Sequence, residues 1–194
     1  GFFEGRNASG NFSSLEPSPT VTSVDDTEVD SAAGGNQTIV ITGTNFKTGD
    51  VASFVGSSAS FNASTTTIDS ATQITAVAPK SSFLNAQEPY KVKVTSSTGL
   101  SGISSTGLIN VDNEPTWSTS SGNLATVYEG QTANISATAT DAEGDTIVYS
   151  VQSGSLPGGT SLNTSTGAIT GTLSAVSNDT TSNFTLRATA NSKT

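Results

Sequence analysis

The sequence predicts an all-β protein in which two small antiparallel β-sandwiches follow one another after an extended N-terminal arm. Its 194 residues match two modules, each able to bury a modest core. It contains 19 glycines, abundant serine and threonine, and only 12% charged residues, a composition that favours strands and turns over helices. Short alternating runs are separated by turn residues, and no stretch has a sustained helical period.

The arm covers residues 1–17 and has no sustained period of either 2 or 3.6 residues. Three aromatic side chains, Phe2, Phe3 and Phe12, stand there among glycine, asparagine and serine. We expect these three residues to bind a partner surface, which is either a neighbouring subunit or the adjoining sandwich.

The first sandwich is predicted over residues 18–112. Ile39 and Ile41 alternate with threonine, and Tyr90 begins a run in which apolar residues alternate with lysine, so each strand buries one face. The predicted strands are Thr20–Val24, Gln37–Thr42, Val51–Val55, Thr65–Ile68, Gln73–Ala78, Tyr90–Thr95 and Leu108–Val111.

A polar hinge, Asp112-Asn113-Glu114-Pro115, separates the two sandwiches, because proline restricts the residue before it and cannot donate a ladder hydrogen bond. The second sandwich is predicted over residues 113–194. Its strands are expected at Leu124–Tyr128, Ala133–Thr140, Thr146–Val151, Ala168–Thr170 and Asn183–Ala190.

Composition also limits the chemistry. Cysteine, methionine and histidine are absent, so there is no disulfide framework, thiolate nucleophile or imidazole base. No G-x-S-x-G elbow or phosphate-binding loop occurs, and we predict that the chain is not an enzyme. The net charge of −9 argues against nucleic acid as a partner, and the absence of a long apolar run argues against membrane insertion.

Residues of the first sandwich resemble the IPT/TIG family of immunoglobulin-like domains. The matching segments are Pro19-Thr20-Val21-Thr22-Ser23-Val24, Gly34-Gly35, Gly43-Thr44-Asn45-Phe46, Ala76-Val77-Ala78-Pro79 and Tyr90-Lys91-Val92-Lys93-Val94. The acidic run at residues 25–30 departs from the uncharged turn usual in that family. The resemblance covers about residues 19–111 and implies a spacer or binding module.

Residues 115–191 resemble putative-Ig and cadherin-like repeats of bacterial or phage surface proteins. The resemblance is carried by two blocks, the sequence from Ala139 to Ser150 and the sequence from Leu156 to Thr172. Asn191 stands where such repeats commonly end on an acidic residue. This resemblance also implies a spacer or binding module and no reaction.

Acidic residues near the hinge suggest a calcium site. Asp141, Glu143 and Asp145 lie within five residues, and Ca²⁺ takes six to eight oxygen ligands from carboxylates and carbonyls. Glu129, Asp112 and Glu114 are candidates to complete a site between the sandwiches, and without metal their repulsion should let the modules pivot about Asn113. The alternative is a solvated acidic turn, and no cofactor is required by any other feature of the sequence.

The only tryptophan, Trp117, follows the hinge. We expect it to fill the end of the second sandwich, the alternative being a contact with a sugar ring.

These observations predict that the chain is a non-catalytic structural module of a virion or cell-surface protein, such as a capsid decoration, fibre or tail appendage. Its expected partners are other structural subunits in an assembly. One alternative is a segment of a bacterial extracellular adhesin that presents a site for a host receptor or glycan. Another is an accessory module of a secreted polysaccharide-active enzyme. All three readings place the chain on a virion, on a cell surface or outside the cell.

Overall fold

The computed structural model describes residues 16–194, and the regular secondary structure in this range consists almost entirely of antiparallel strands. Within this range the helical segments are two 3₁₀ turns, η1 (Lys80–Ser82) and η2 (Asn85–Gln87). The all-β prediction is therefore confirmed. In the same part of the chain, no helix has the length and apolar character needed to cross a membrane.

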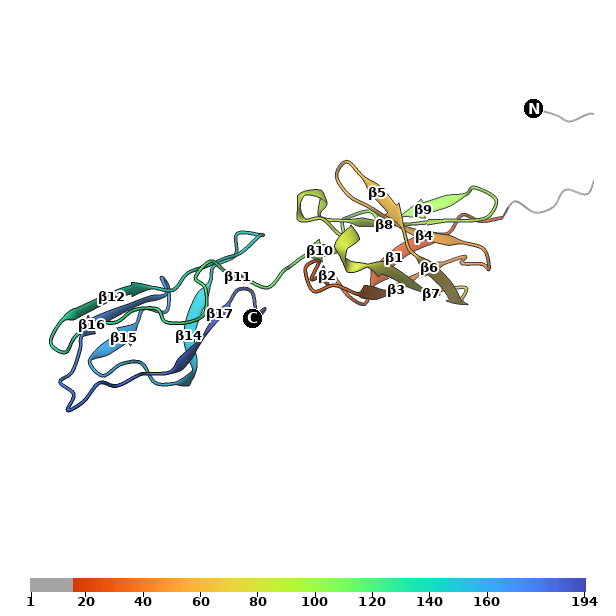
Figure 1. Cartoon of the computed structure of the whole chain (residues 1–194). Helices are drawn as coiled ribbons and strands as arrows, with labels where there is room; N and C mark the ends of the chain where they lie inside the picture. The colour runs from red at the N-terminus through yellow and green to blue at the C-terminus, as the bar shows by residue number, and fades with distance from the viewer. Residues whose placement is uncertain (1–15) are drawn as a thin grey trace, which may run out of the picture.

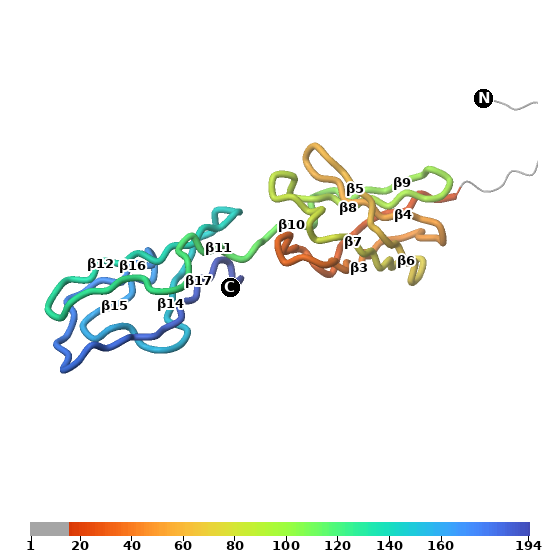
Figure 2. The backbone as a smooth tube through the Cα atoms, viewed as in Figure 1, coloured from red at the N-terminus to blue at the C-terminus, as the bar shows by residue number. Residues whose placement is uncertain are grey.

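The sheets form two groups that are joined end to end by residues 112–115, as Figure 1 shows. We call residues 20–111 the first module and residues 116–194 the second module. The tube in Figure 2 shows that the chain passes once from the first module to the second.

The first module has two four-stranded sheets and one short parallel pair. One sheet has the order β1-β3-β7-β6, with bounds Thr20–Val24, Asn36–Thr44, Gln73–Pro79 and Thr65–Ser70. The other has the order β5-β4-β8-β9, with bounds Ser60–Asn62, Val51–Val55, Lys91–Thr95 and Ser101–Ile103. The parallel pair joins β10 (Asn110–Val111) to β2 (Glu28–Val29) at the end facing the second module (Figure 1).

The core of the first module is formed by the residues that the alternating pattern turns inward. Ile39, Ile41 and Val92 are fully buried, whereas Lys93 points outward. An aromatic cluster of Phe54, Phe61, Phe83 and Tyr90 fills one end, with ring centroids 5.0–5.8 Å apart. The Tyr90 hydroxyl accepts a hydrogen bond from the Leu84 N–H (2.7 Å), and burial raises the pKa of this phenol.

The second module has one three-stranded sheet and two pairs. The three-stranded sheet is β12-β16-β15, with bounds Thr132–Ser136, Ala168–Thr172 and Thr160–Leu162. One pair joins β14 (Val148–Gly154) to β17 (Phe184–Thr189), and the other joins β11 (Thr116–Trp117) to β13 (Ala139–Thr140). Its buried hydrophobic residues are mostly small: Ala133, Ala137, Tyr149, Ile169, Ala188 and Ala190.

One strand prediction in the second module is wrong, and another is correct only in part. Leu124–Tyr128 is irregular, because no neighbouring strand in the described range supplies a backbone ladder for it. Ala133–Thr140 is broken at Ala137 and Thr138, where the chain changes partners. Before this break β12 pairs with β16, and after it β13 pairs with β11. At the break, the Ala137 N–H donates to the Gly167 carbonyl (3.1 Å).

Candidate functional site: the joint between the modules

The hinge is anchored to the first module. Asp112 follows β10, and its N–H donates to the Val29 carbonyl (3.0 Å), which extends the β2–β10 pair by one residue. Asp112 and Asn113 are both buried and expose only 3% and 8% of their surface. Buried polar groups of this kind need partners, and the contacts of the hinge supply most of them.

Asn113 contacts both modules through one carboxamide. Its Oδ1 accepts hydrogen bonds from the Ser31 hydroxyl (2.9 Å) and the Ala32 N–H (3.1 Å) of the first module. Its Nδ2 donates to Glu143 Oε1 (2.9 Å) of the second module, and its backbone N–H donates to Glu143 Oε2 (3.1 Å). The residue thus ties the two modules together with four hydrogen bonds, two of them to a carboxylate.

The loop that carries Glu143 is itself ordered by Asp141. Asp141 Oδ1 accepts the N–H groups of Glu143 (3.1 Å) and Asp145 (3.0 Å), which closes a compact turn after β13. This turn presents the Glu143 carboxylate to Asn113.

Three more contacts cross the joint. Asn191 Nδ2 donates to Asp112 Oδ2 (2.8 Å), and Asn85 Nδ2 donates to the Ala142 carbonyl (2.9 Å). Lys193 Nζ and Glu28 Oε2 lie 4.0 Å apart, an exposed pair of the kind that contributes little. The joint is therefore held by polar contacts from five separate segments of the chain.

Two carboxylate oxygens of the joint have no hydrogen-bond partner. Asp112 Oδ1 and Asp141 Oδ2 are buried, and no polar atom of residues 16–194 lies within hydrogen-bond distance and geometry. A buried carboxylate oxygen without a partner carries a desolvation cost, which a proton, a water or a cation would offset.

The structure does not gather the six predicted calcium ligands into one site. In the described range, no group of three or more Asp, Glu, His or Cys side chains is arranged to hold a metal ion. Glu129 lies at the far end of β12 and accepts the Val176 N–H (2.8 Å), while Asp112, Asp141 and Glu143 are at the joint. Glu114 lines two cavities beside the hinge, and Asp145 enters the turn through its backbone. Calcium binding itself stays a prediction.

The other predicted contact residues, Phe2, Phe3 and Phe12, lie outside the described residues.

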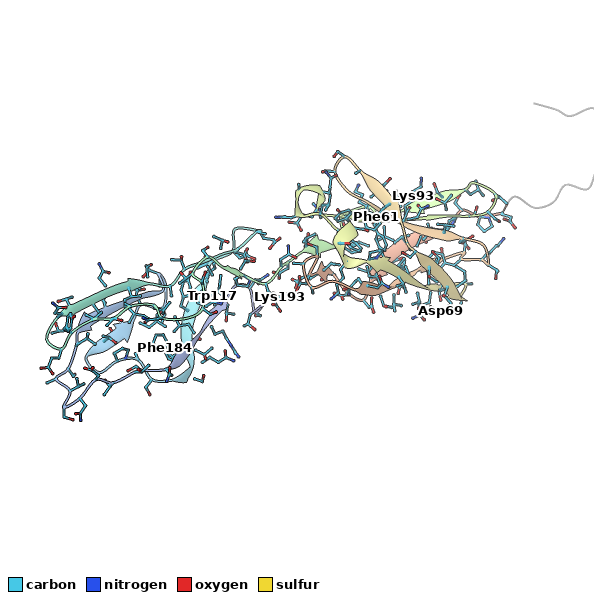
Figure 3. The ribbon with its side chains drawn as sticks, viewed as in Figure 1. Phe61, Asp69, Lys93, Trp117, Phe184 and Lys193 are labelled. Atoms are coloured by element: carbon cyan, nitrogen blue, oxygen red, sulfur yellow. The ribbon has the colours of Figure 1, made fainter. Side chains whose placement is uncertain are left out.

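Trp117 is less buried than its predicted place at the sandwich end requires. It exposes 37% of its surface, and its ring centroid lies 5.9 Å from that of Tyr149. Two cavities of about 340 Å³ flank it, one against β17 and one against residues 30–33 of the first module. Figure 3 places Trp117 and Lys193 on the side of the second module that faces the first.

One feature of the sequence, the asparagine within the acidic hinge, could have predicted the contacts of the joint, but the calcium hypothesis did not take it into account. A carboxamide both donates and accepts, so Asn113 in an acidic hinge can bridge a carboxylate on one side and N–H or O–H donors on the other. The modules were expected to pivot about Asn113. In the structure, this residue makes more hydrogen bonds than any other residue of the hinge.

Comparison with protein families finds a match in the second half of the chain. The model described as "Putative Ig domain" matches residues 114–194. No curated protein matches the chain significantly.

Several solved structures are similar to this chain. An I-band fragment of titin is 8% identical, with a TM-score of 0.46, and the match covers 89% of this chain and 65% of that one. The insect immune protein hemolin is 14% identical, with a TM-score of 0.37 and coverage of 84% and 42%. The mouse nectin-like molecule 4 ectodomain is 14% identical, with a TM-score of 0.31 and coverage of 82% and 55%.

The chain thus spans less than two thirds of each of these structures, and with TM-scores below 0.5 none of them bears on its function. The family match and the antiparallel sheets of β11 to β17 both support an immunoglobulin-like domain in residues 114–194.

Proposed function

We propose that this chain is a non-catalytic structural segment of a virion or cell-surface protein, in which two immunoglobulin-like modules are held at a set angle to each other. The two modules lie within the domains proposed from the sequence, residues 18–112, which resemble IPT/TIG domains, and residues 113–194, which resemble cadherin-like repeats. The observation that carries the proposal is the set of four hydrogen bonds made by Asn113. A spacer that transmits orientation needs such a joint, whereas a flexible tether does not.

The energetics support a set angle. Hydrogen bonds to charged groups contribute about 1.5–3 kcal/mol each, and Asn113 makes two of them to Glu143. The bond from Asn191 to Asp112 adds a further contact to a carboxylate. Together these bonds exceed the thermal energy that would drive a free pivot, even after ordering of the side chains is counted.

The partners in this proposal are other structural subunits, which the arm would contact through Phe2, Phe3 and Phe12. A second candidate is an adhesin segment that presents a site for a host receptor or glycan. The partly exposed Trp117 ring beside a cavity of about 340 Å³ favours it, because aromatic faces stack on sugars. An accessory module of a secreted polysaccharide-active enzyme would use the same surface.

The orientation hypothesis predicts that Asn113→Asp broadens the distribution of inter-module angles. The substitution keeps the shape and the acceptor for Ser31 but removes the Nδ2 donor and sets a second carboxylate against Glu143. Spin labels on cysteines replacing Ser97 and Ser177 measure the effect, since both sites are exposed and the chain has no native cysteine. We expect one narrow distance in the parent protein and a broad one in the variant.

The control is Asn123→Asp, which adds the same charge at an exposed asparagine whose single side-chain contact is a 3.4 Å bond to Thr126. It should leave the narrow distance unchanged. A broad distribution in the parent protein would contradict the proposal, as would a narrow one that persists in Asn113→Asp.

Calcium is proposed as a weak stabilising ligand of the joint. The unpartnered oxygens of Asp112 and Asp141 favour it, whereas the dispersed placement of Glu129 limits the number of ligands. A ligand at a hundredfold excess over its Kd stabilises a folded protein by about 2.7 kcal/mol. We expect millimolar Ca²⁺, compared with chelator, to raise the melting temperature by at most a few degrees.

Asp141→Asn combined with Asp145→Asn should remove any such rise. A rise of tens of degrees that this double substitution abolishes would mean that the carboxylates come together around the ion, and it would overturn the weak-site proposal.

A further inference from the structure

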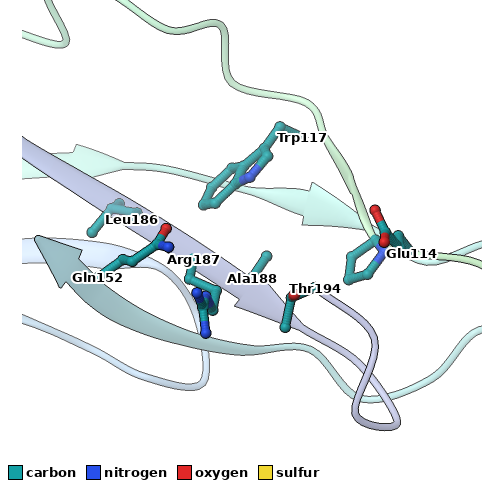
Figure 4. A pocket seen from close by; sticks show the side chains of 8 residues that line it. Glu114, Trp117, Gln152, Leu186, Arg187, Ala188 and Thr194 are labelled. Atoms are coloured by element: carbon teal, nitrogen blue, oxygen red, sulfur yellow. The ribbon is translucent and has the colours of Figure 1, made fainter.

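The cavity between Trp117 and β17 combines an apolar wall with polar side chains. It has a volume of about 340 Å³, and small-ligand sites begin at about 300 Å³. Figure 4 shows the Trp117 ring facing β17 across this space. Leu186 and Ala188 of β17 supply apolar area opposite the ring. The long polar side chains of the lining are those of Glu114, Gln152 and Arg187.

Trp117 is exposed but held in place. β11 pairs with β13, so Trp117 lies opposite Ala139. Its ring centroid lies 5.9 Å from that of Tyr149, whose hydroxyl accepts a hydrogen bond from the Ala139 N–H (3.0 Å). Trp117 nevertheless exposes 37% of its surface. A ring that a strand pair and a second ring fix, yet that stays open to solvent, is a preformed flat apolar surface.

The three polar side chains of the lining have no other partner in the described range. Among residues 16–194, no side-chain hydrogen bond or ion pair involves Glu114, Gln152 or Arg187, and the two charged groups do not pair with each other. A carboxylate only accepts hydrogen bonds, a guanidinium only donates them, and a carboxamide does both. The cavity is therefore lined by both kinds of hydrogen-bonding group, each free to bond to a ligand.

A β-bulge places Gln152 at the cavity. In the β14–β17 pair, Val151 is opposite Leu186 and Ser153 is opposite Thr185, so Gln152 is one extra residue without a partner on β17. A bulge bends its strand and changes the direction of a side chain, and bulges are common beside functional sites. The bulge thus gives the cavity a polar side chain from a strand that does not otherwise line it.

A pyranose ring has the chemistry that these groups fit. Its C–H face is apolar and stacks on aromatic rings, while each of its hydroxyl groups both donates and accepts hydrogen bonds. The charges of Glu114 and Arg187 cancel, so the cavity lining is neutral although the whole chain carries a net charge of −9. A neutral sugar therefore fits better than a uronate or a phosphate, which the Glu114 carboxylate would repel.

The cavity on the other side of Trp117, beside residues 30–33, is less suited to a sugar. Its Asp30 carboxylate already accepts hydrogen bonds from the N–H groups of Ala32 (3.1 Å) and Ala33 (3.0 Å). In the part of the chain that the structure describes, no amide or basic side chain lines it.

We propose that the cavity between Trp117 and β17 binds a neutral pyranose residue of a glycan. The sugar ring stacks on Trp117. Glu114 accepts hydrogen bonds from its hydroxyl groups, and Gln152 and Arg187 donate to them. This inference rests on the second candidate function, an adhesin segment that presents a glycan site, and it assigns the residues of that site and the class of sugar.

The test uses the whole chain and two sets of immobilised oligosaccharides. One set ends in glucose, galactose, mannose or N-acetylhexosamine, and the other ends in a uronate or a sialic acid. We expect binding to the neutral set. The strongest neutral binder is then titrated in solution while the emission of Trp117, the only tryptophan, is recorded. Because the sugar covers the exposed ring, the emission should change and reach saturation.

Variants of the polar lining should weaken this binding. Arg187→Ala should raise the Kd at least about tenfold, and Gln152→Ala about threefold, because the first removes a hydrogen bond to a charged group and the second a neutral one. Gln131→Ala is the matched control, since Gln131 is also exposed but does not line the cavity. It should leave the Kd unchanged, and all three variants should keep the parent melting temperature.

Three results would overturn the proposal. Binding confined to the charged oligosaccharides would contradict the assignment to a neutral sugar, and an absence of binding to both sets would contradict the site. Binding that leaves Trp117 emission unchanged, or that Arg187→Ala does not weaken, would place the ligand elsewhere. The distance between the spin labels is measured independently, so a narrow distance without glycan binding would overturn this inference and leave the set inter-module angle standing.

Discussion

Phe83→Ala is expected to lower the free energy of unfolding of the first module by about 3–5 kcal/mol, the usual cost of removing a buried phenylalanine. Phe83 is fully buried, and its ring centroid lies 5.0 Å from those of Phe54 and Phe61. The surrounding sheet strands hold these rings in place, so the site cannot collapse to fill the space. Denaturant titration followed by the NMR signals of first-module residues measures the loss.

The second module should be unaffected by this substitution. The core cluster that contains Phe83 runs from Val29 to Val111, and no buried side chain of the second module belongs to it. Trp117 emission, which reports the second module, should therefore keep its midpoint. Leu84→Ala is the neighbouring control, because Leu84 is 54% exposed and its loss should cost less than about 0.5 kcal/mol. An equal shift of the Trp117 midpoint would mean that the two modules unfold as one unit.

Gly167→Ala is expected to destabilise the second module by on the order of 3 kcal/mol, from backbone strain and steric overlap combined. Gly167 has φ of +71°, and a Cβ there would lie 1.9 Å from the Ala137 carbonyl oxygen. That carbonyl belongs to the point where β12 ends and the chain changes sheets, so it cannot move without disturbing the Ala137–Gly167 hydrogen bond. The Trp117 emission midpoint in denaturant measures the effect.

Gly130→Ala separates strain from overlap. Gly130 has a similar φ of +74°, but a Cβ there would meet no atom within 4 Å. It should cost only the left-handed strain, about 1–2 kcal/mol. If both substitutions cost the same, the close approach of Gly167 to Ala137 does not exist in solution.

Strand prediction succeeded where one face of a strand is buried. The run from Gln37 to Thr42 lies within β3, and the run from Gln73 to Ala78 lies within β7, because alternation of apolar and polar residues reflects burial directly. It failed for Leu124–Tyr128, where four of the five residues are apolar but no strand of residues 16–194 pairs with them. Short strands such as β5 and β9 were not predicted, because three residues are too few to show a period.

From the sequence, the location of the candidate site could be predicted, but the contacts within it could not. The hinge at residues 112–115 and the acidic turn after β13 were both identified from composition and proline placement. Their partners Ser31, Asn85 and Asn191 are common polar residues that lie 57 or more positions away in the sequence from the residues they contact, and nothing local distinguishes them from other asparagines and serines.

The sequence by itself determined an all-β chain with a hinge near Asn113 and a match to immunoglobulin-like repeats after it. Periodicity, turn residues and proline are local properties, so they can be recognised in the sequence before the fold is known. Only the tertiary structure decided that Asn113 bonds to both modules and that two buried carboxylate oxygens of the joint lack a hydrogen-bond partner among the described residues. Each of these depends on which distant segments meet, and the pairing of segments is set by packing of the whole chain rather than by the character of any one of them.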